Sequence, residues 1–126
     1  MNGESLKIRS FTDLHAWQEA HALVVAIYTL TKLFPKEELF GLTSQVRRAA
    51  ISVPSNIAEG FSRGSYKERH QFYSIARGSL TEVQSQLLIA RDVHYINSDM
   101  CEKLFLQTET VSRIINGLMK STKALC

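Results

Sequence analysis

Apolar residues recur at three- and four-residue steps along most of this 126-residue chain, and few helix-breaking residues interrupt them. This spacing is typical of amphipathic helices. The chain has only six glycines and two prolines, whereas an all-β fold needs a turn signal about every 8 to 12 residues. Compact domains usually hold about 100 to 150 residues. The sequence therefore predicts one all-α domain.

This pattern, together with helix-breaking and capping residues between its segments, predicts four helices. Pro35 ends the first helix, Arg63-Gly64 separates the second from the third, and Asn97-Ser98-Asp99 offers N-caps for the fourth. Ser65 and Glu68 have the spacing of a capping box at the start of the third. We expect helices over about residues 13–34, from the 36–41 segment to 62, over 65–94, and from 97–99 to about 122.

Short connections between four amphipathic helices favour an up-down-up-down antiparallel four-helix bundle. We assign residues 12–123 to this bundle domain and residues 1–11 to an N-terminal arm, which offers Leu6, Ile8 and Phe11 for packing on the bundle or on a neighbour. The first helix has an apolar arc of roughly 200°, wider than the stripe of about 100° that one core face needs. The excess apolar area needs a second cover, either another helix or another subunit.

Two residues inside the predicted helices are unusual. Pro54 lacks the N–H that would bond to the Ala50 carbonyl, which predicts a kink in the second helix or, alternatively, a break into two helices at Val53. Gly78 in the third helix costs up to about 1 kcal/mol relative to alanine. Close approach of another helix would explain this glycine.

Positive charge is concentrated in the middle of the chain. The formal net charge is +3, and residues 45–70 account for it, with five basic side chains against Glu59 and Glu68. Clustered positive charge suits a polyanionic partner such as nucleic acid. The alternative is a solvated helix face with scattered ion pairs.

Sequence patterns for other functions are weak. No Glu-x-x-His step supplies the ligands of a di-metal bundle site, no glycine-rich phosphate loop occurs, and Cys101 and Cys126 do not resemble a disulfide framework. The longest uncharged stretch of the first helix, Ala22–Thr31, is too short to cross a bilayer. We expect no metal, no cofactor, no enzymatic activity and no membrane partner, and a cytoplasmic location.

Polar residues lie next to core positions on the second and third helices. Because buried polar groups are normally paired, one hypothesis is an interhelical polar ladder, with Arg48 and Glu82 as a candidate ion pair. Its members are Gln45, Ser52, Asn56, Glu59, Ser79, Glu82 and Gln86. A second hypothesis assigns outward-facing phosphate contacts, with Phe61, Tyr66 or Tyr73 for base stacking. These contacts are Arg47, Arg48, Arg63, Lys67, Arg69 and Arg77.

Several motifs resemble one known family. They are Phe34–Glu38, Gly41–Gln45 and the block Arg47–Gly60 (RRAAISVPSNIAEG), supported by Ile75–Ser79 with Glu82 and Gln86-Leu87, and by Phe11, Asp13-Leu14 and Trp17-Gln18. Together they resemble the signature of bacterial four-helix bundle proteins encoded by intervening sequences in 23S rRNA genes. The similarity spans roughly Phe11 to Leu118.

The resemblance implies a bundle that assembles into a ring-like homo-oligomer, a pentamer, with basic residues lining or flanking a central channel. Related accessory proteins of diversity-generating retroelements have a similar fold and bind nucleic acid and a reverse transcriptase. No catalytic activity is associated with the family.

These observations lead to one main functional hypothesis and one alternative. The first is a non-enzymatic oligomer that binds nucleic acid, RNA rather than DNA, with several weak cationic sites acting together. The alternative is a scaffold that docks a protein partner such as a reverse transcriptase on the basic face.

Overall fold

Four long helices account for most of the protein. A computed structural model describes residues 7–124, with side chains from residue 7 to 122. The helices are α1 (His15–Thr31), α2 (Leu42–Ser62), α3 (Tyr66–Asp92) and α4 (Ser98–Ala124), and two 3-10 turns, η2 (Phe11–Asp13) and η3 (Lys36–Glu38), precede α1 and α2. No strand occurs between residues 7 and 124. Leu6 of the predicted arm lies outside the described residues.

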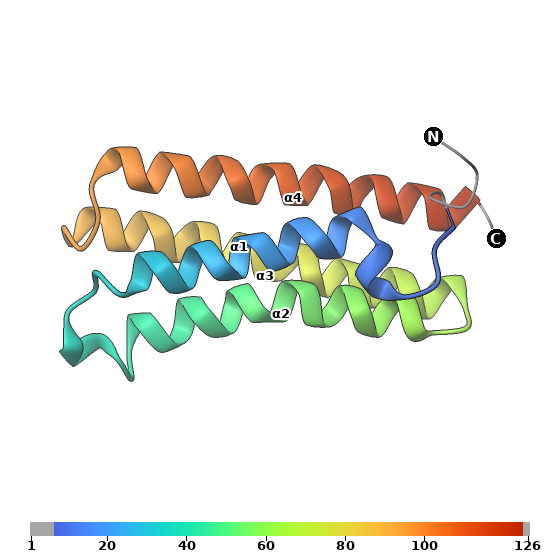
Figure 1. Cartoon of the computed structure of the whole chain (residues 1–126), viewed down its shortest axis with the longest axis horizontal. Coiled ribbons are helices and arrows are strands. Elements are labelled where there is room, and N and C mark those ends of the chain that lie inside the picture. Colours follow the sequence, from blue (N-terminus) through green and yellow to red (C-terminus); the bar gives the residue numbers. More distant parts are fainter. Residues whose placement is uncertain (1–6, 125–126) are drawn as a thin grey trace.

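The helices form the predicted up-down-up-down bundle. Successive connections lie at alternating ends, so neighbouring helices are antiparallel (Figure 1). Each helix packs against two others: α1 and α3 both contact α2 and α4, and the pairs α1/α3 and α2/α4 are diagonal. The α2–α3 pair is the most extensive. The all-α prediction is confirmed.

The core lies along the bundle axis, where each helix contributes residues at three- and four-residue steps. Burying one aliphatic side chain contributes about 1.5–3 kcal/mol, so this seam supplies most of the driving force for folding. Its most buried aliphatic members are Leu23 and Ile27 of α1, Val46, Val53 and Ile57 of α2, Leu80, Val83 and Leu87 of α3, and Val111 and Ile115 of α4.

The first helix is shorter at both ends than predicted. Asp13 belongs to η2, where its carboxylate accepts the backbone N–H groups of Arg9 and Ser10 at 3.0 and 3.1 Å. At the other end the helix stops at Thr31, and Phe34 is buried beside Tyr95 with ring centroids 5.5 Å apart. Local hydrogen bonds and tertiary packing therefore set both boundaries.

The caps of the later helices are those that the sequence offers. The Ser65 hydroxyl accepts the Glu68 N–H at 3.1 Å at the start of α3, and the Asn97 side chain accepts the Met100 N–H at 2.8 Å at the start of α4. The third helix ends two residues before the predicted His94, which has a positive φ of 66°. This left-handed residue turns the chain toward α4.

The structure bears on the predictions made for Pro54 and Gly78. Helix α2 is continuous through the buried Pro54, so the alternative of two helices broken at Val53 is wrong. The kink at Pro54 stays a prediction. Gly78 does not mark a close helix contact, because a β-carbon there would meet nothing within 4 Å. The glycine that α2 and α3 require is Gly60, where a β-carbon would lie 2.6 Å from Cε1 of Tyr73.

Candidate nucleic-acid interface

The six predicted phosphate contacts lie in three separate places. Arg47 and Arg48 line a groove between α1 and α2, and Arg77 lies on α3 beside α4. The other three, Arg63, Lys67 and Arg69, lie at the α2–α3 turn. The structure therefore does not gather the predicted contacts into a single patch.

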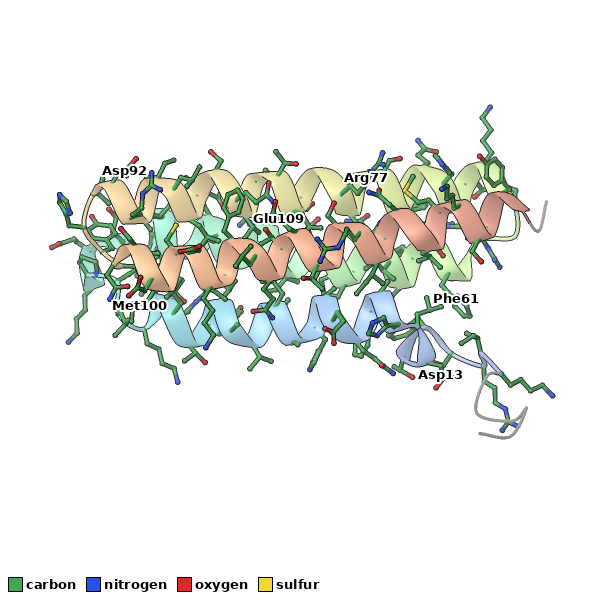
Figure 2. All side chains as sticks on the ribbon, turned by 90° about the horizontal axis from the view of Figure 1, so that it is seen from above. Asp13, Phe61, Arg77, Asp92, Met100 and Glu109 are labelled. Carbon is green, nitrogen blue, oxygen red and sulfur yellow. The ribbon has the colours of Figure 1, made fainter. Side chains whose placement is uncertain are left out.

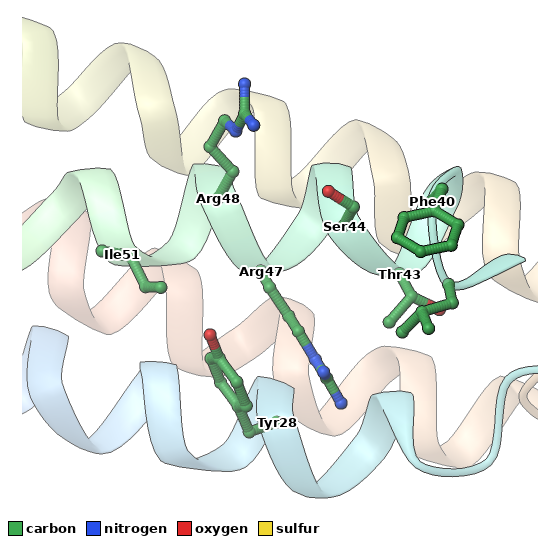
Figure 3. A pocket seen from close by; sticks show the side chains of 8 residues that line it. Tyr28, Phe40, Thr43, Ser44, Arg47, Arg48 and Ile51 are labelled. Atoms are coloured by element: carbon green, nitrogen blue, oxygen red, sulfur yellow. The ribbon is translucent and has the colours of Figure 1, made fainter.

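Arg47 links α2 to α1. Its Nε donates to the Thr31 hydroxyl at 2.8 Å, and its guanidinium carbon lies 4.4 Å from the Tyr28 ring centroid. The Thr31 hydroxyl donates in turn to the Ile27 carbonyl at 2.8 Å. Figure 3 shows Arg47 extending toward α1 alongside Tyr28, whereas Arg48 points away from α1. Thr31, whose side chain is buried in this link, was not among the residues predicted from the sequence.

The same groove exposes large apolar side chains. Phe40 is 94% exposed and Ile51 is 40% exposed, and both line a hollow of about 460 Å³. Ile51 also borders a second hollow of about 340 Å³ that includes Trp17 and Val24. We call this continuous surface the α1–α2 face. Trp17, Val24 and Tyr28 of this face belong to α1, whose wide apolar arc predicts excess apolar area there.

Arg63 and Arg69 are held by contacts at the α2–α3 turn. Arg63 pairs with Glu59 at 2.9 Å and lies 4.7 Å from the Phe72 ring centroid. Arg69 donates from Nε to the Arg63 carbonyl at 2.7 Å and lies 5.8 Å from the ring centroid of Phe61. Lys67 is exposed beside them.

The base-stacking hypothesis is wrong for one aromatic residue. Tyr73 is only 1% exposed, and burial raises the pKa of its hydroxyl. It packs in the core against Gly60 and cannot present a ring face to a base. Phe61, with the Arg69 guanidinium carbon 5.8 Å from its ring centroid, and Tyr66, 5.3 Å from the His70 ring, are both half-buried and stay candidates.

Part of the predicted polar ladder exists. The hydroxyls of Ser52 and Ser79 lie 2.8 Å apart across α2 and α3, and Asn56 donates to the Ser52 carbonyl and hydroxyl at 2.8 and 2.9 Å. These three residues connect the two helices in the most extensive helix pair of the bundle.

The other predicted ladder members do not join it. Glu59 pairs with Arg63 along α2, Gln45 and Glu82 are exposed, and Gln86 has a buried side-chain oxygen without a partner in the described structure. The predicted Arg48–Glu82 ion pair is wrong, because the ion pairs within the described residues are Arg63–Glu59 and Arg91–Asp92. Both side chains of the predicted pair are exposed, so neither needs a buried partner.

A pocket between α3 and α4 contains cations that were not predicted from the sequence. It has a volume of about 570 Å³ and is lined by His70, Arg77, Arg113, Asn116, Gly117, Met119 and Lys120. The sequence did contain a sign of this pocket, because Arg113 and Lys120 are seven residues apart, about two helical turns, and so lie on one face of α4. Arg77 joins them because Asn116 accepts its Nη1 hydrogen at 3.0 Å. Figure 2 shows Arg77 on α3 alongside α4.

The structure also places residues relevant to other chemistry. Residues 60–64 read Gly-Phe-Ser-Arg-Gly, the spacing of a nucleophile elbow. However, Ser62 ends helix α2 and donates to the Glu59 carbonyl at 2.6 Å, so the residue does not lie on the strand-to-helix turn that such an elbow needs.

Burial raises the pKa of the Cys101 thiol, which disfavours a thiolate. No cluster of three potential metal ligands occurs in residues 7–122. Across the described helices, none has an apolar stretch that could span a bilayer.

Fold and surface together define a small four-helix-bundle protein with a divided basic surface. The model of the 23S rRNA-intervening sequence protein family matches residues 12–117, and the chain belongs to this family. No curated protein matches the chain. A crystal structure from Bacteroides thetaiotaomicron VPI-5482, a protein of unknown function from the S23 ribosomal protein family, is similar with a TM-score of 0.77. It has 19% sequence identity and aligns over 83% of this chain and 98% of that chain, a likeness that shows the fold.

Proposed function

We propose that this protein is a non-enzymatic, cytoplasmic homo-oligomer that binds RNA through several cationic sites on each subunit. The observation that carries the proposal is the lack of charge compensation. Of the six predicted phosphate contacts, Arg63 alone has a carboxylate at salt-bridge distance within the described residues. The other five have no carboxylate at that distance among the described residues, which leaves them available to an external polyanion.

Three of these arginines are also held in place by neutral groups. Arg47 donates to a threonine hydroxyl, Arg69 to a backbone carbonyl and Arg77 to an asparagine oxygen. A guanidinium has five N–H donors, so each of these contacts leaves several for phosphate oxygens. Fixing the guanidinium beforehand reduces the entropy lost when a phosphate binds.

Two exposed apolar regions support assembly into an oligomer. The α1–α2 face is one, and the outer stripe of α3, with Ile75 and Ile89 each 47% exposed and Val93 48% exposed beyond its end, is another. Different surfaces that meet head to tail generate a closed ring where the rotation between subunits closes. A ring of five subunits is the assembly that the family resemblance implies, and it repeats each cationic site five times.

Repetition makes weak sites useful. In a plot of log affinity against log salt concentration, each neutralised phosphate of a single strand contributes about −0.7 to the slope. A subunit with a few cations therefore binds weakly at physiological salt, whereas several subunits on one strand gain from high effective concentration.

The test is fluorescence anisotropy with a labelled single-stranded oligoribonucleotide between 50 and 200 mM salt. We expect affinity to fall steeply over this range and to fall further in the Arg48→Glu/Lys67→Glu variant, because both side chains are exposed and their loss leaves the arginine contacts intact. The control, Lys32→Glu/Lys103→Glu, makes the same change in net charge at exposed sites on α4 and near the end of α1. Weak binding at 50 mM salt, or equal effects of both variants, would contradict the proposal.

A further inference from the structure

We propose that the pocket between α3 and α4 binds a phosphate group, and that this phosphate belongs to the RNA backbone; the source of the phosphate rests on the function proposed above. The pocket lies outside the 45–70 segment that carries the net charge of the sequence, apart from His70 at its edge. We call it the α3–α4 pocket.

The charged side chains that line the α3–α4 pocket favour an anion. Arg77, Arg113 and Lys120 reach it from two helices, and His70 adds an imidazole. None of the seven lining residues, all of which the structure describes, is acidic. A bound phosphate would be attracted to all three cationic side chains around this one hollow.

Arg77 and Arg113 are oriented without loss of charge. Asn116, itself a lining residue, accepts one N–H of Arg77, and the Thr110 hydroxyl accepts one N–H of Arg113 at 3.3 Å. Both acceptors are neutral, so they position the guanidinium groups and leave their charge for a ligand. Arginine suits this task because its planar donors match phosphate oxygens.

Gly117 leaves open space in the lining of the pocket. It lies in the interior of α4, where glycine is less stable than alanine. No described glycine has a positive φ, and a β-carbon on Gly117 would meet nothing within 4 Å. Neither backbone conformation nor packing inside the subunit therefore requires a glycine here. Gly117 lines both this pocket and a smaller hollow beside α1, and a side chain that points into the pocket would occupy space that a bound phosphate and its sugar could use.

The α3–α4 pocket lies on the opposite side of the bundle from the α1–α2 face, because α1 and α3 are diagonal, as are α2 and α4. The α1–α2 face and the α3–α4 pocket are thus separate. A change in one can be made without altering residues of the other.

The first experiment removes charge from the α3–α4 pocket. The variant is Arg113→Gln/Lys120→Gln, which leaves the interhelical Arg77–Asn116 bond intact, and the control is Lys32→Gln/Lys103→Gln. Affinity for a labelled single-stranded oligoribonucleotide should fall at least about fivefold at 0.1 M salt for each phosphate that is no longer neutralised, with a shallower salt dependence. The control should change affinity less than about twofold.

The second experiment fills the hollow without changing charge. Gly117→Leu should weaken RNA binding by a similar factor, whereas Gly78→Leu, at an exposed glycine of α3 with equally open space, should not. Circular dichroism checks that both variants remain helical. Equal affinities of wild type and both pocket variants would overturn the pocket proposal while leaving RNA binding in place.

A third measurement separates failure of the pocket from failure of the proposed function. Inorganic pyrophosphate is titrated into labelled protein, and the backbone amide signals of residues 110–120 are followed by NMR. Shifts there that disappear in Arg113→Gln/Lys120→Gln support the pocket. If wild type binds no oligoribonucleotide at 50 mM salt, the proposed function and the RNA source fail; if pyrophosphate also causes no shift, the pocket fails as well.

Discussion

Gly60 lies where α2 and α3 leave no room for a side chain. A β-carbon there would lie 2.6 Å from Tyr73 Cε1 and 3.1 Å from the Phe72 β-carbon. We expect Gly60→Ala to lower the free energy of unfolding by about 1–3 kcal/mol, because the buried tyrosine ring must move. Urea unfolding followed by circular dichroism measures the change.

Gly78→Ala is the matched control, since it makes the same chemical change at an exposed helical position with open space. It should raise stability by up to about 1 kcal/mol through helix propensity. Equal effects of the two substitutions would show that α2 and α3 do not approach each other at Gly60 as described.

Ser52 is the centre of the polar contact between α2 and α3. Its hydroxyl bonds to Ser79 and accepts from Asn56. We expect Ser52→Ala to cost about 1–2 kcal/mol, because a net hydrogen bond contributes about 1 kcal/mol and the Ser79 hydroxyl is left buried without this partner. The exposed Ser55→Ala should change stability by less than about 0.5 kcal/mol.

A double-mutant cycle tests whether the two serines act together. The destabilisation of Ser52→Ala/Ser79→Ala should be smaller than the sum of the two single effects, since the second substitution removes a group that already lacks its partner. Additive effects would mean that the two hydroxyls do not interact.

At the scale of elements, one carboxylate joins the α1–α2 connection to the turn between α3 and α4. Glu38 of η3 accepts the Tyr95 hydroxyl at 2.6 Å and the Leu42 N–H at 3.0 Å. The Tyr95 bond is the main reason that the pKa of Glu38 is lower than its ordinary value of 4.5, and the Leu42 N–H adds to the effect. The ionised form is thus the one that the fold stabilises.

The pH dependence follows from this direction. The contribution of Glu38 is fully present above pH 4.5, the pKa expected in the unfolded chain, and is lost as the pH falls through the lower folded value. We expect wild type to lose more stability between about pH 5 and 3 than Glu38→Gln does. Glu37→Gln, on the same turn and exposed, is the control and should follow the wild-type curve.

The elements themselves were largely predictable, because periodicity, prolines and N-caps are local signals. Ser65 and Asn97 cap α3 and α4 as their positions suggest. The amino-terminal end of α1 had a local signal, because Ser10 and Asp13 have the spacing of a capping box. The carboxyl-terminal end was not predictable, since Phe34 packs against Tyr95, a residue far away in the sequence. Tertiary contacts of that kind leave no pattern in a short window of sequence.

At the scale of the molecule, the basic surface was harder to predict than the fold. Counting charge along the chain selected residues 45–70, but a bundle brings together residues that are far apart in sequence. Arg77 meets Asn116 across α3 and α4, which places Arg113 and Lys120 beside it. Charge density in the sequence identified Arg47 and Arg69, whose guanidinium groups are held by internal contacts. It did not identify Arg113 and Lys120, which line the α4 side of the α3–α4 pocket.

Assembly is the property that connects the apolar and cationic surfaces. Phe40→Ser/Ile51→Ser removes the two exposed apolar side chains at the centre of the α1–α2 face without changing net charge. We expect light scattering to show a multiple of the 14.3 kDa chain for wild type and a single chain for this variant. RNA affinity should fall about 100-fold, because each separated subunit loses the gain from its neighbours.

The control substitutes exposed apolar residues elsewhere on the bundle, Met100→Ser/Leu106→Ser on α4, and should keep both the assembly and the affinity. The comparison is informative because every cation is present in both variants. A single-chain variant that binds RNA as tightly as wild type would mean that one subunit suffices, and the cations of one bundle would then have to account for the whole affinity.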